Sequence, residues 1–169
     1  MAALSFISAI HQLCETHSYS EDIRELLNMM LHGKSTIHFL EYLDDRNLGL
    51  AHIKGQAMEV VLDYAQLILE DNVLSQDEIF NIRYLRRFFN IEDGEFLEYG
   101  KRARVEAILI EQLEKLYADN KIDKEEMLHK SEMQGLFGLG YDDYQEIVNK
   151  VAIEAYSRGA DLKDLDTYL

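Results

Sequence analysis

Apolar residues recur every three or four positions along most of the chain, and this spacing predicts amphipathic helices. The stretch from about 50 to 70 is the most apolar. One of its faces carries Met58, Val61, Ala65 and Ile68. A helix that is apolar around so much of its circumference is normally central in a bundle. The stretch from about 95 to 118 has the same character, and its Gly100 is a point where the helix can bend.

Capping and turn residues divide the rest of the chain into shorter helices. Ser20 precedes two acids, where a helix N-terminus favours them, and Gly33 is suited to ending that helix. The other predicted helices span about 4–17, 35–43, 75–89, 123–137 and 141–158. The chain contains no proline, which helix interiors reject. The pattern predicts an all-α fold, a compact bundle of about seven helices in one domain, residues 1–169.

Two segments match each other at an offset of 48 residues. Residues 70–78 read Glu-Asp-Asn-Val-Leu-Ser-Gln-Asp-Glu, and residues 118–126 read Ala-Asp-Asn-Lys-Ile-Asp-Lys-Glu-Glu. In each copy a capping residue stands three positions before the last glutamate, which is the spacing of a capping box. The matched pairs are Asp71 with Asp119, Asn72 with Asn120, Leu74 with Ile122, Ser75 with Asp123, and Glu78 with Glu126. We expect both asparagines to adopt the left-handed conformation and both apolar residues to enter the core.

The match predicts two helical-hairpin repeats over residues 51–158, each an apolar helix, an Asp-Asn turn and a capped helix. Residues 1–50 supply N-terminal helices outside the repeats. Residues 159–169 alternate acids and leucines, and are expected to form either a short docking helix or a loose acidic tail.

The repeated turn resembles the hallmark of the tellurite-resistance TerB-like family, Ala-Asp-Gly-x-Ile-x-x-x-Glu followed by an amphipathic helix. Residues 118–126 resemble it most fully, with Asn120 at the glycine position, and residues 70–78 resemble it less fully, with Asn72 there. The resemblance covers roughly residues 51–158. It implies an all-helical fold with acidic loops, roles in metal or stress responses, and use as an adaptor in larger bacterial systems.

The net charge of the chain limits the classes of partner that it can bind. Lys and Arg total 17 against 32 Asp and Glu, a net charge of −15. Such a chain repels phosphate backbones and anionic membrane surfaces, so we expect no direct nucleic-acid binding. No apolar run reaches the roughly 18 residues that span a bilayer, and the N-terminus lacks the basic start of a signal peptide. We expect a soluble, cytoplasmic protein without membrane insertion. Cys14 is the single cysteine, so no internal disulfide forms.

Acidic residues suggest a divalent-cation site. No Lys or Arg occurs from Gly55 to Ile82. If the repeats face each other, Asp71, Glu78, Asp119 and Glu126 converge, and such carboxylates favour magnesium, calcium or manganese. An EF-hand is excluded, because leucine, lysine and tyrosine occupy the loop positions that must supply oxygen ligands. The alternative is a pair of capped turns on a solvated acidic face.

Basic residues cluster at two places in this acidic chain. Arg83, Arg86 and Arg87 belong to one predicted helix, and Lys101, Arg102 and Arg104 begin another. If the two helices pack together, they form a basic patch that suits an acidic partner. Otherwise they pair with the acids at 92–98.

No set of residues amounts to an active site, since a nucleophile with an oriented base and a phosphate-binding glycine loop are both missing from the sequence. We therefore expect a non-enzymatic interaction module, an accessory or adaptor subunit that binds another protein. The resemblance places it in a bacterial stress or defence system. Two alternatives stay open: a divalent-cation-binding module, and an acidic inhibitor that mimics nucleic acid.

Overall fold

The computed structural model describes residues 4–69 and 74–167, and every regular element in those ranges is a helix. The all-α prediction is confirmed. The chain forms two compact units, unit 1 (Met1–Glu92) and unit 2 (Asp93–Leu169). The single domain stays a prediction, because two compact units can still fold as one cooperative domain. Within the described ranges, no helix combines the length and apolar character needed to cross a bilayer.

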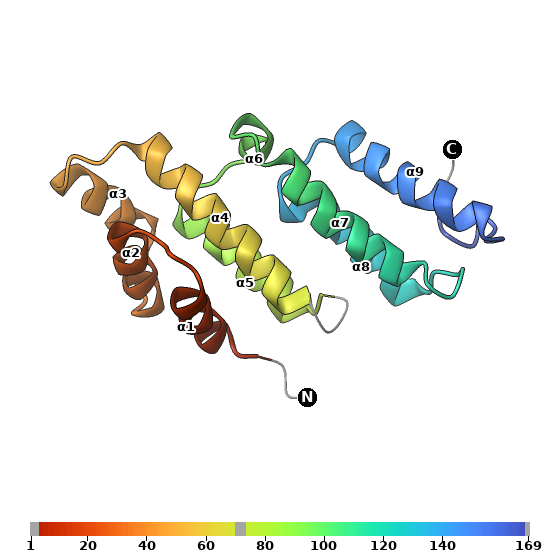
Figure 1. Ribbon diagram of the computed structural model, residues 1–169, viewed down its shortest axis with the longest axis horizontal. Helices are drawn as coiled ribbons and strands as arrows, with labels where there is room; N and C mark the ends of the chain where they lie inside the picture. The colour runs from red at the N-terminus through yellow and green to blue at the C-terminus, as the bar shows by residue number, and fades with distance from the viewer. Residues whose placement is uncertain (1–3, 70–73, 168–169) are drawn as a thin grey trace. The chain divides into compact units, whose positions relative to one another are not determined.

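The helices follow the predicted ranges closely, with one exception. Unit 1 contains α1 (Phe6–Thr16), α2 (Glu21–Leu31), α3 (Thr36–Asp45), α4 (Leu50–Leu69) and α5 (Gln76–Phe88) (Figure 1). Unit 2 contains α6 (Glu95–Glu98), α7 (Arg102–Leu116), α8 (Lys124–Leu136) and α9 (Tyr141–Ser157). The described residues thus form nine helices where about seven were expected.

The exception is the predicted helix over 95–118, which is interrupted at Gly100. This glycine has a φ of 71°, in the left-handed region that costs glycine little. The N–H of Lys101 turns back to the carbonyl of Phe96 at 2.8 Å, which closes α6 before α7 begins. At Gly100, where a bend was expected, the helix is therefore interrupted completely.

Unit 1 is organised around α4, which packs against α1, α2 and α5. Side chains on several faces of α4 are buried between Ala57 and Ala65, as expected for a helix that is apolar around much of its circumference. The ring of Phe6 on α1 meets the ring of Tyr64 edge-on at 5.5 Å and that of Tyr84 on α5 at 5.9 Å. Burial raises the pKa of Tyr64 to about 12, and its hydroxyl accepts a hydrogen bond from the Asn81 amide at 3.1 Å.

An aromatic cluster fixes the C-terminal end of α5. The ring of Phe39 on α3 lies 6.0 Å from that of Phe88 and 5.7 Å from that of Phe89, and all three side chains are buried. Beside them, the Thr36 hydroxyl donates a hydrogen bond to the carbonyl oxygen of Arg87 at 2.7 Å. These contacts hold the last turn of α5 against the start of α3.

Both predicted capping boxes are confirmed. Ser75 caps α5 and exchanges hydrogen bonds with Glu78, and Asp123 caps α8 and exchanges them with Glu126. Asn120 has the expected left-handed conformation, with a φ of 62°. Its counterpart at position 72 lies outside the described residues.

The two apolar residues of these turns behave differently. Leu74 is buried as expected, whereas Ile122 is only half-buried. The turn before α8 also contacts the C-terminal segment, because the N–H of Ile122 donates to the carbonyl of Asp164 at 2.8 Å. The turn before α8 is therefore pinned by this segment as well as by the core.

Unit 2 is built around α7, which packs against α8 and α9, with Phe96 and Phe137 in edge-on contact at 5.5 Å. Residues 160–167 form tight turns packed on this unit, so these residues are neither the short docking helix nor the loose tail that were the two expectations. Leu165 has no exposed surface, and Thr167 is almost completely buried.

Lys130 on α8 holds the C-terminal segment in place. Its Nζ donates hydrogen bonds to the carbonyl oxygens of Leu165 at 3.1 Å and Asp166 at 2.6 Å, and to the Thr167 hydroxyl at 3.0 Å. Burial lowers the pKa of Lys130, and the nearby Asp166 carboxylate opposes this effect. A buried ammonium is tolerated here because three acceptors match its three donors.

Replacing Lys130 by methionine should destabilise the protein, because the carbonyl oxygen of Asp166 loses its Nζ donor and that of Leu165 keeps only the bond from the Thr167 hydroxyl. We expect the free energy of unfolding to fall by roughly 1–3 kcal/mol, as measured by urea denaturation followed by circular dichroism. Lys150, exposed on α9, provides the matched control Lys150→Met. Equal losses in the two variants would contradict the assigned role.

Candidate functional site

The rotation of α5 determines which of its side chains face solvent. Its buried side chains include Ile79, Ile82, Leu85 and Phe88. Its exposed side chains are Gln76, Asp77, Phe80, Arg83 and Arg87, and the last four recur at spacings of three or four residues. These four residues share one face of the helix and are called the α5 stripe below. From the N-terminal to the C-terminal end of α5, the stripe presents an acid, an aromatic ring and two basic groups.

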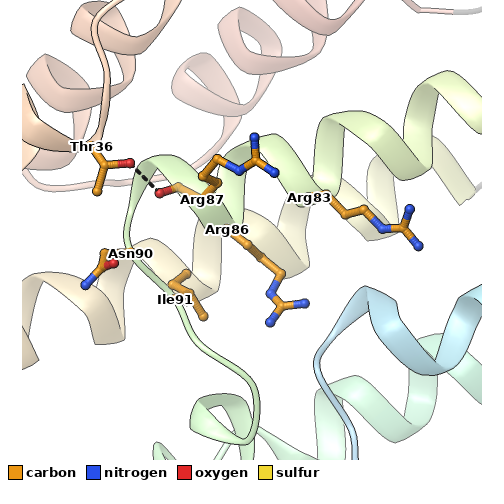
Figure 2. A pocket seen from close by; sticks show the side chains of 6 residues that line it. All are labelled: Thr36, Arg83, Arg86, Arg87, Asn90 and Ile91. Atoms are coloured by element: carbon orange, nitrogen blue, oxygen red, sulfur yellow. Dashed lines mark hydrogen bonds between the residues drawn. The ribbon is translucent and has the colours of Figure 1, made fainter.

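The basic end of the α5 stripe borders a surface depression of about 330 Å³. The depression is lined by Thr36, Arg83, Arg86, Arg87, Asn90 and Ile91. Figure 2 shows that the three arginine side chains spread away from one another, rather than converging on one point. An anionic ligand would therefore meet the guanidinium groups one at a time, as a segment that carries several carboxylates can.

The arginines of this depression differ in exposure and in their contacts with the rest of the protein. Arg86 is 8% exposed and takes part in an interaction within the protein. Arg83 and Arg87 are exposed, and neither guanidinium forms an ion pair with another residue of the described ranges. They are four positions apart on one helix, where two like charges cost roughly 0.2–0.5 kcal/mol. None of the lining residues is acidic, so an anion bound there would relieve that repulsion.

The second basic cluster from the sequence has a different environment. Arg102 at the start of α7 pairs with Asp143, with Glu106 at 3.2 Å and with Glu146 at 3.8 Å. These carboxylates, Asp143 foremost, raise the pKa of Arg102. Lys101 and Arg104 are also engaged in interactions. Arg102 thus links α7 to α9 within unit 2. Because the two clusters lie in different units, the joint basic patch stays a prediction.

The predicted metal ligands are partly occupied by local hydrogen bonds. The Glu78 carboxylate accepts bonds from the backbone N–H of Ser75 at 2.7 Å and from its hydroxyl at 2.8 Å. Glu126 accepts from the N–H of Asp123 at 2.8 Å. The Asp119 carboxylate accepts from the N–H of Lys121 at 3.1 Å. Asp71 lies outside the described residues.

Across residues 4–69 and 74–167, no three His, Cys, Asp or Glu side chains are grouped closely enough to hold a metal ion. Glu78 lies in unit 1, and Asp119 and Glu126 lie in unit 2. The divalent-cation site therefore stays a prediction, and the capping role of the two glutamates is the part that the structure supports.

The acidic end of the α5 stripe borders a second depression, of about 360 Å³, between the N-terminal ends of α1 and α5. It is lined by Leu4, Ser5, Phe6, Ser75, Asp77, Glu78, Phe80 and Asn81. Phe80 is 67% exposed and Leu4 41%, so this depression has an apolar side. Sequence reasoning missed this feature, although Phe80 is out of phase with the buried positions 79, 82 and 85 and could have been found from that offset.

Comparisons of this chain with protein-family models, with curated proteins and with solved structures find no match.

Neutralising Arg83 should not weaken the fold. We expect Arg83→Gln to leave the free energy of unfolding unchanged or to raise it by about 0.2–0.5 kcal/mol, because it removes repulsion by Arg87. The comparison is Arg46→Gln. Arg46 pairs with Glu25 at 3.0 Å and lies 4.6 Å from the centre of the Tyr42 ring, so its loss should cost roughly 1 kcal/mol. Urea denaturation of both variants measures the contrast, and a larger loss for Arg83→Gln would show a structural role.

The predicted cation site can be tested by thermal unfolding of chelated protein, with magnesium, calcium or manganese added singly. Occupancy at about 100 times the dissociation constant should stabilise the protein by roughly 2.7 kcal/mol. A site at the repeated turns requires that Asp71→Asn with Asp119→Asn abolish the shift. A shift that persists in this double variant would place the cation elsewhere.

Proposed function

We propose that this protein is a non-enzymatic interaction module, an accessory or adaptor subunit that binds an acidic segment of another protein along α5. The observation that carries the proposal is the arginine-lined depression at the C-terminal end of α5, in a chain with a net charge of −15. The resemblance to TerB-like domains adds the setting of a bacterial stress or defence system.

The chemistry of the depression suits carboxylates. A guanidinium group can donate two parallel hydrogen bonds to a carboxylate, and such charge-assisted bonds are stronger than neutral ones. Arg83 and Arg87 are exposed on one face of the helix, one turn apart. The spread of their side chains favours a segment with several acids over a single small anion.

The same proposal includes the two hairpin repeats, α4 with α5 and α7 with α8. Matching capping boxes at Ser75 and Asp123 support it, as does the packing of the two helices in each pair. The repeats are not equivalent in function, because the exposed arginines of α5 have no basic counterpart at matching positions of α8. There, Arg83 and Arg87 correspond to Ser131 and Gly135.

Charge reversal tests the proposed site. A fluorescently labelled oligoglutamate peptide should bind the wild-type protein more weakly as salt rises, and Arg83→Glu with Arg87→Glu should weaken binding at least tenfold. Fluorescence anisotropy measures both effects.

The control is Lys150→Glu with Arg158→Glu, which changes the net charge equally at exposed positions of unit 2. Equal loss in both double variants would reduce the binding to bulk charge, and no wild-type binding would contradict the proposal directly.

A further inference from the structure

We propose that the bound segment is an amphipathic helix lying antiparallel to α5. Its acidic N-terminal end would meet Arg83 and Arg87, an apolar side chain would contact Phe80, and its basic C-terminal end would meet Asp77. The inference rests on the proposed function, because it uses the same two arginines and adds the shape, polarity and direction of the partner.

The apolar centre of the α5 stripe is the first support. Phe80 and Leu4 line the same depression, and both side chains are largely exposed. A purely acidic segment would leave this apolar surface in water, whereas an apolar side chain of a partner would bury it. Recognition at α5 therefore requires an apolar anchor in addition to carboxylates.

The spacing of the α5 stripe supports a helix. Asp77, Phe80, Arg83 and Arg87 are separated by three, three and four residues, which spans about 15 Å of helix axis. A second helix repeats its side chains at the same interval, so each of its contact positions can meet one group of the stripe. An extended strand would advance about twice as far per residue and lose this register.

The order of charges sets the direction of the partner. The basic end of the stripe requires acids and the acidic end requires bases, so the reverse orientation would place like charges together. A free helix is itself more stable with acids in its first turn and bases in its last. Both preferences agree only when the partner runs antiparallel to α5.

A second copy of α5 carries the same order of charges, with acids in its first turn and arginines in its last. Two chains of net charge −15 repel each other, however, which opposes self-association. The favoured occupant is therefore a helix of a different protein that is less acidic overall.

Two designed peptides of identical composition test the direction. One runs from glutamates through leucine to lysines, and the other has the reversed sequence. The reversed peptide could pair its charges with the stripe only by lying parallel to α5, with lysines in its own first turn and glutamates in its last, against the helix dipole. In fluorescence anisotropy, the forward peptide should bind at least tenfold more tightly than the reversed one.

Variants distinguish the contribution of the apolar contact at Phe80 to binding from that of the arginines. Phe80→Ser and Asp77→Lys should each weaken binding of the forward peptide about tenfold, while binding of oligoglutamate should not weaken. Tyr141→Ser is the matched control, because Tyr141 is equally exposed but lies in unit 2. It should leave both affinities unchanged.

The outcomes separate the two proposals. Equal affinity for the two peptide orders, or no effect of Phe80→Ser, would overturn the inference. The proposed function would still stand in that case if oligoglutamate binds through Arg83 and Arg87. Failure of every peptide to bind would overturn both. Dimerisation in sedimentation velocity that Phe80→Ser abolishes would overturn the inference by identifying a second copy as the occupant.

Discussion

The burial of Ile79, Ile82, Leu85 and Phe88 is the constraint on which the rest of the binding surface depends. These side chains fix the rotation of α5 against α4 and α3, and the rotation decides what the helix presents to solvent. Turning the helix by one residue would bury a charged group and expose the core, at a cost of several kcal/mol. The α5 stripe is thus a consequence of core packing, which fixes the side of the helix from which its residues project.

The charged residues of the protein fall into two kinds. Arg46, Arg102 and Lys130 each contact carboxylates or carbonyl oxygens that join neighbouring elements, so their charges serve the fold. Arg83 and Arg87 repel each other on an exposed face. Sites that break a local rule without a compensating contact are where function is most often found.

Local signals predicted much of the fold, and long-range packing accounts for what they missed. The capping boxes at Ser75 and Asp123, the left-handed Asn120 and the ends of most helices follow from residues close in sequence. The break at Gly100 was underestimated, because a glycine in an apolar stretch can bend or end a helix depending on what the next turn packs against.

The site was predictable only in part, for the same reason. The arginine cluster on α5 is visible in the sequence, but the depression beside it also needs Thr36 and Asn90, which are brought there by α3 and by the chain reversal after α5. The exposure of Phe80 depends on the rotation of the helix, and the acidic and leucine-rich composition of 160–167 gave no sign that Lys130 would bind their carbonyl oxygens.

The place of Lys130 in unit 2 has a kinetic consequence. Its three acceptors lie 35 to 37 residues further along the chain, beyond α9. Closing so long a loop costs chain entropy, so we expect residues 160–167 to attach late in folding, after the transition state. Substitutions in that segment would then act mainly on the unfolding rate and leave the folding rate almost unchanged. The contact between Lys130 and this segment would then govern how long unit 2 stays folded.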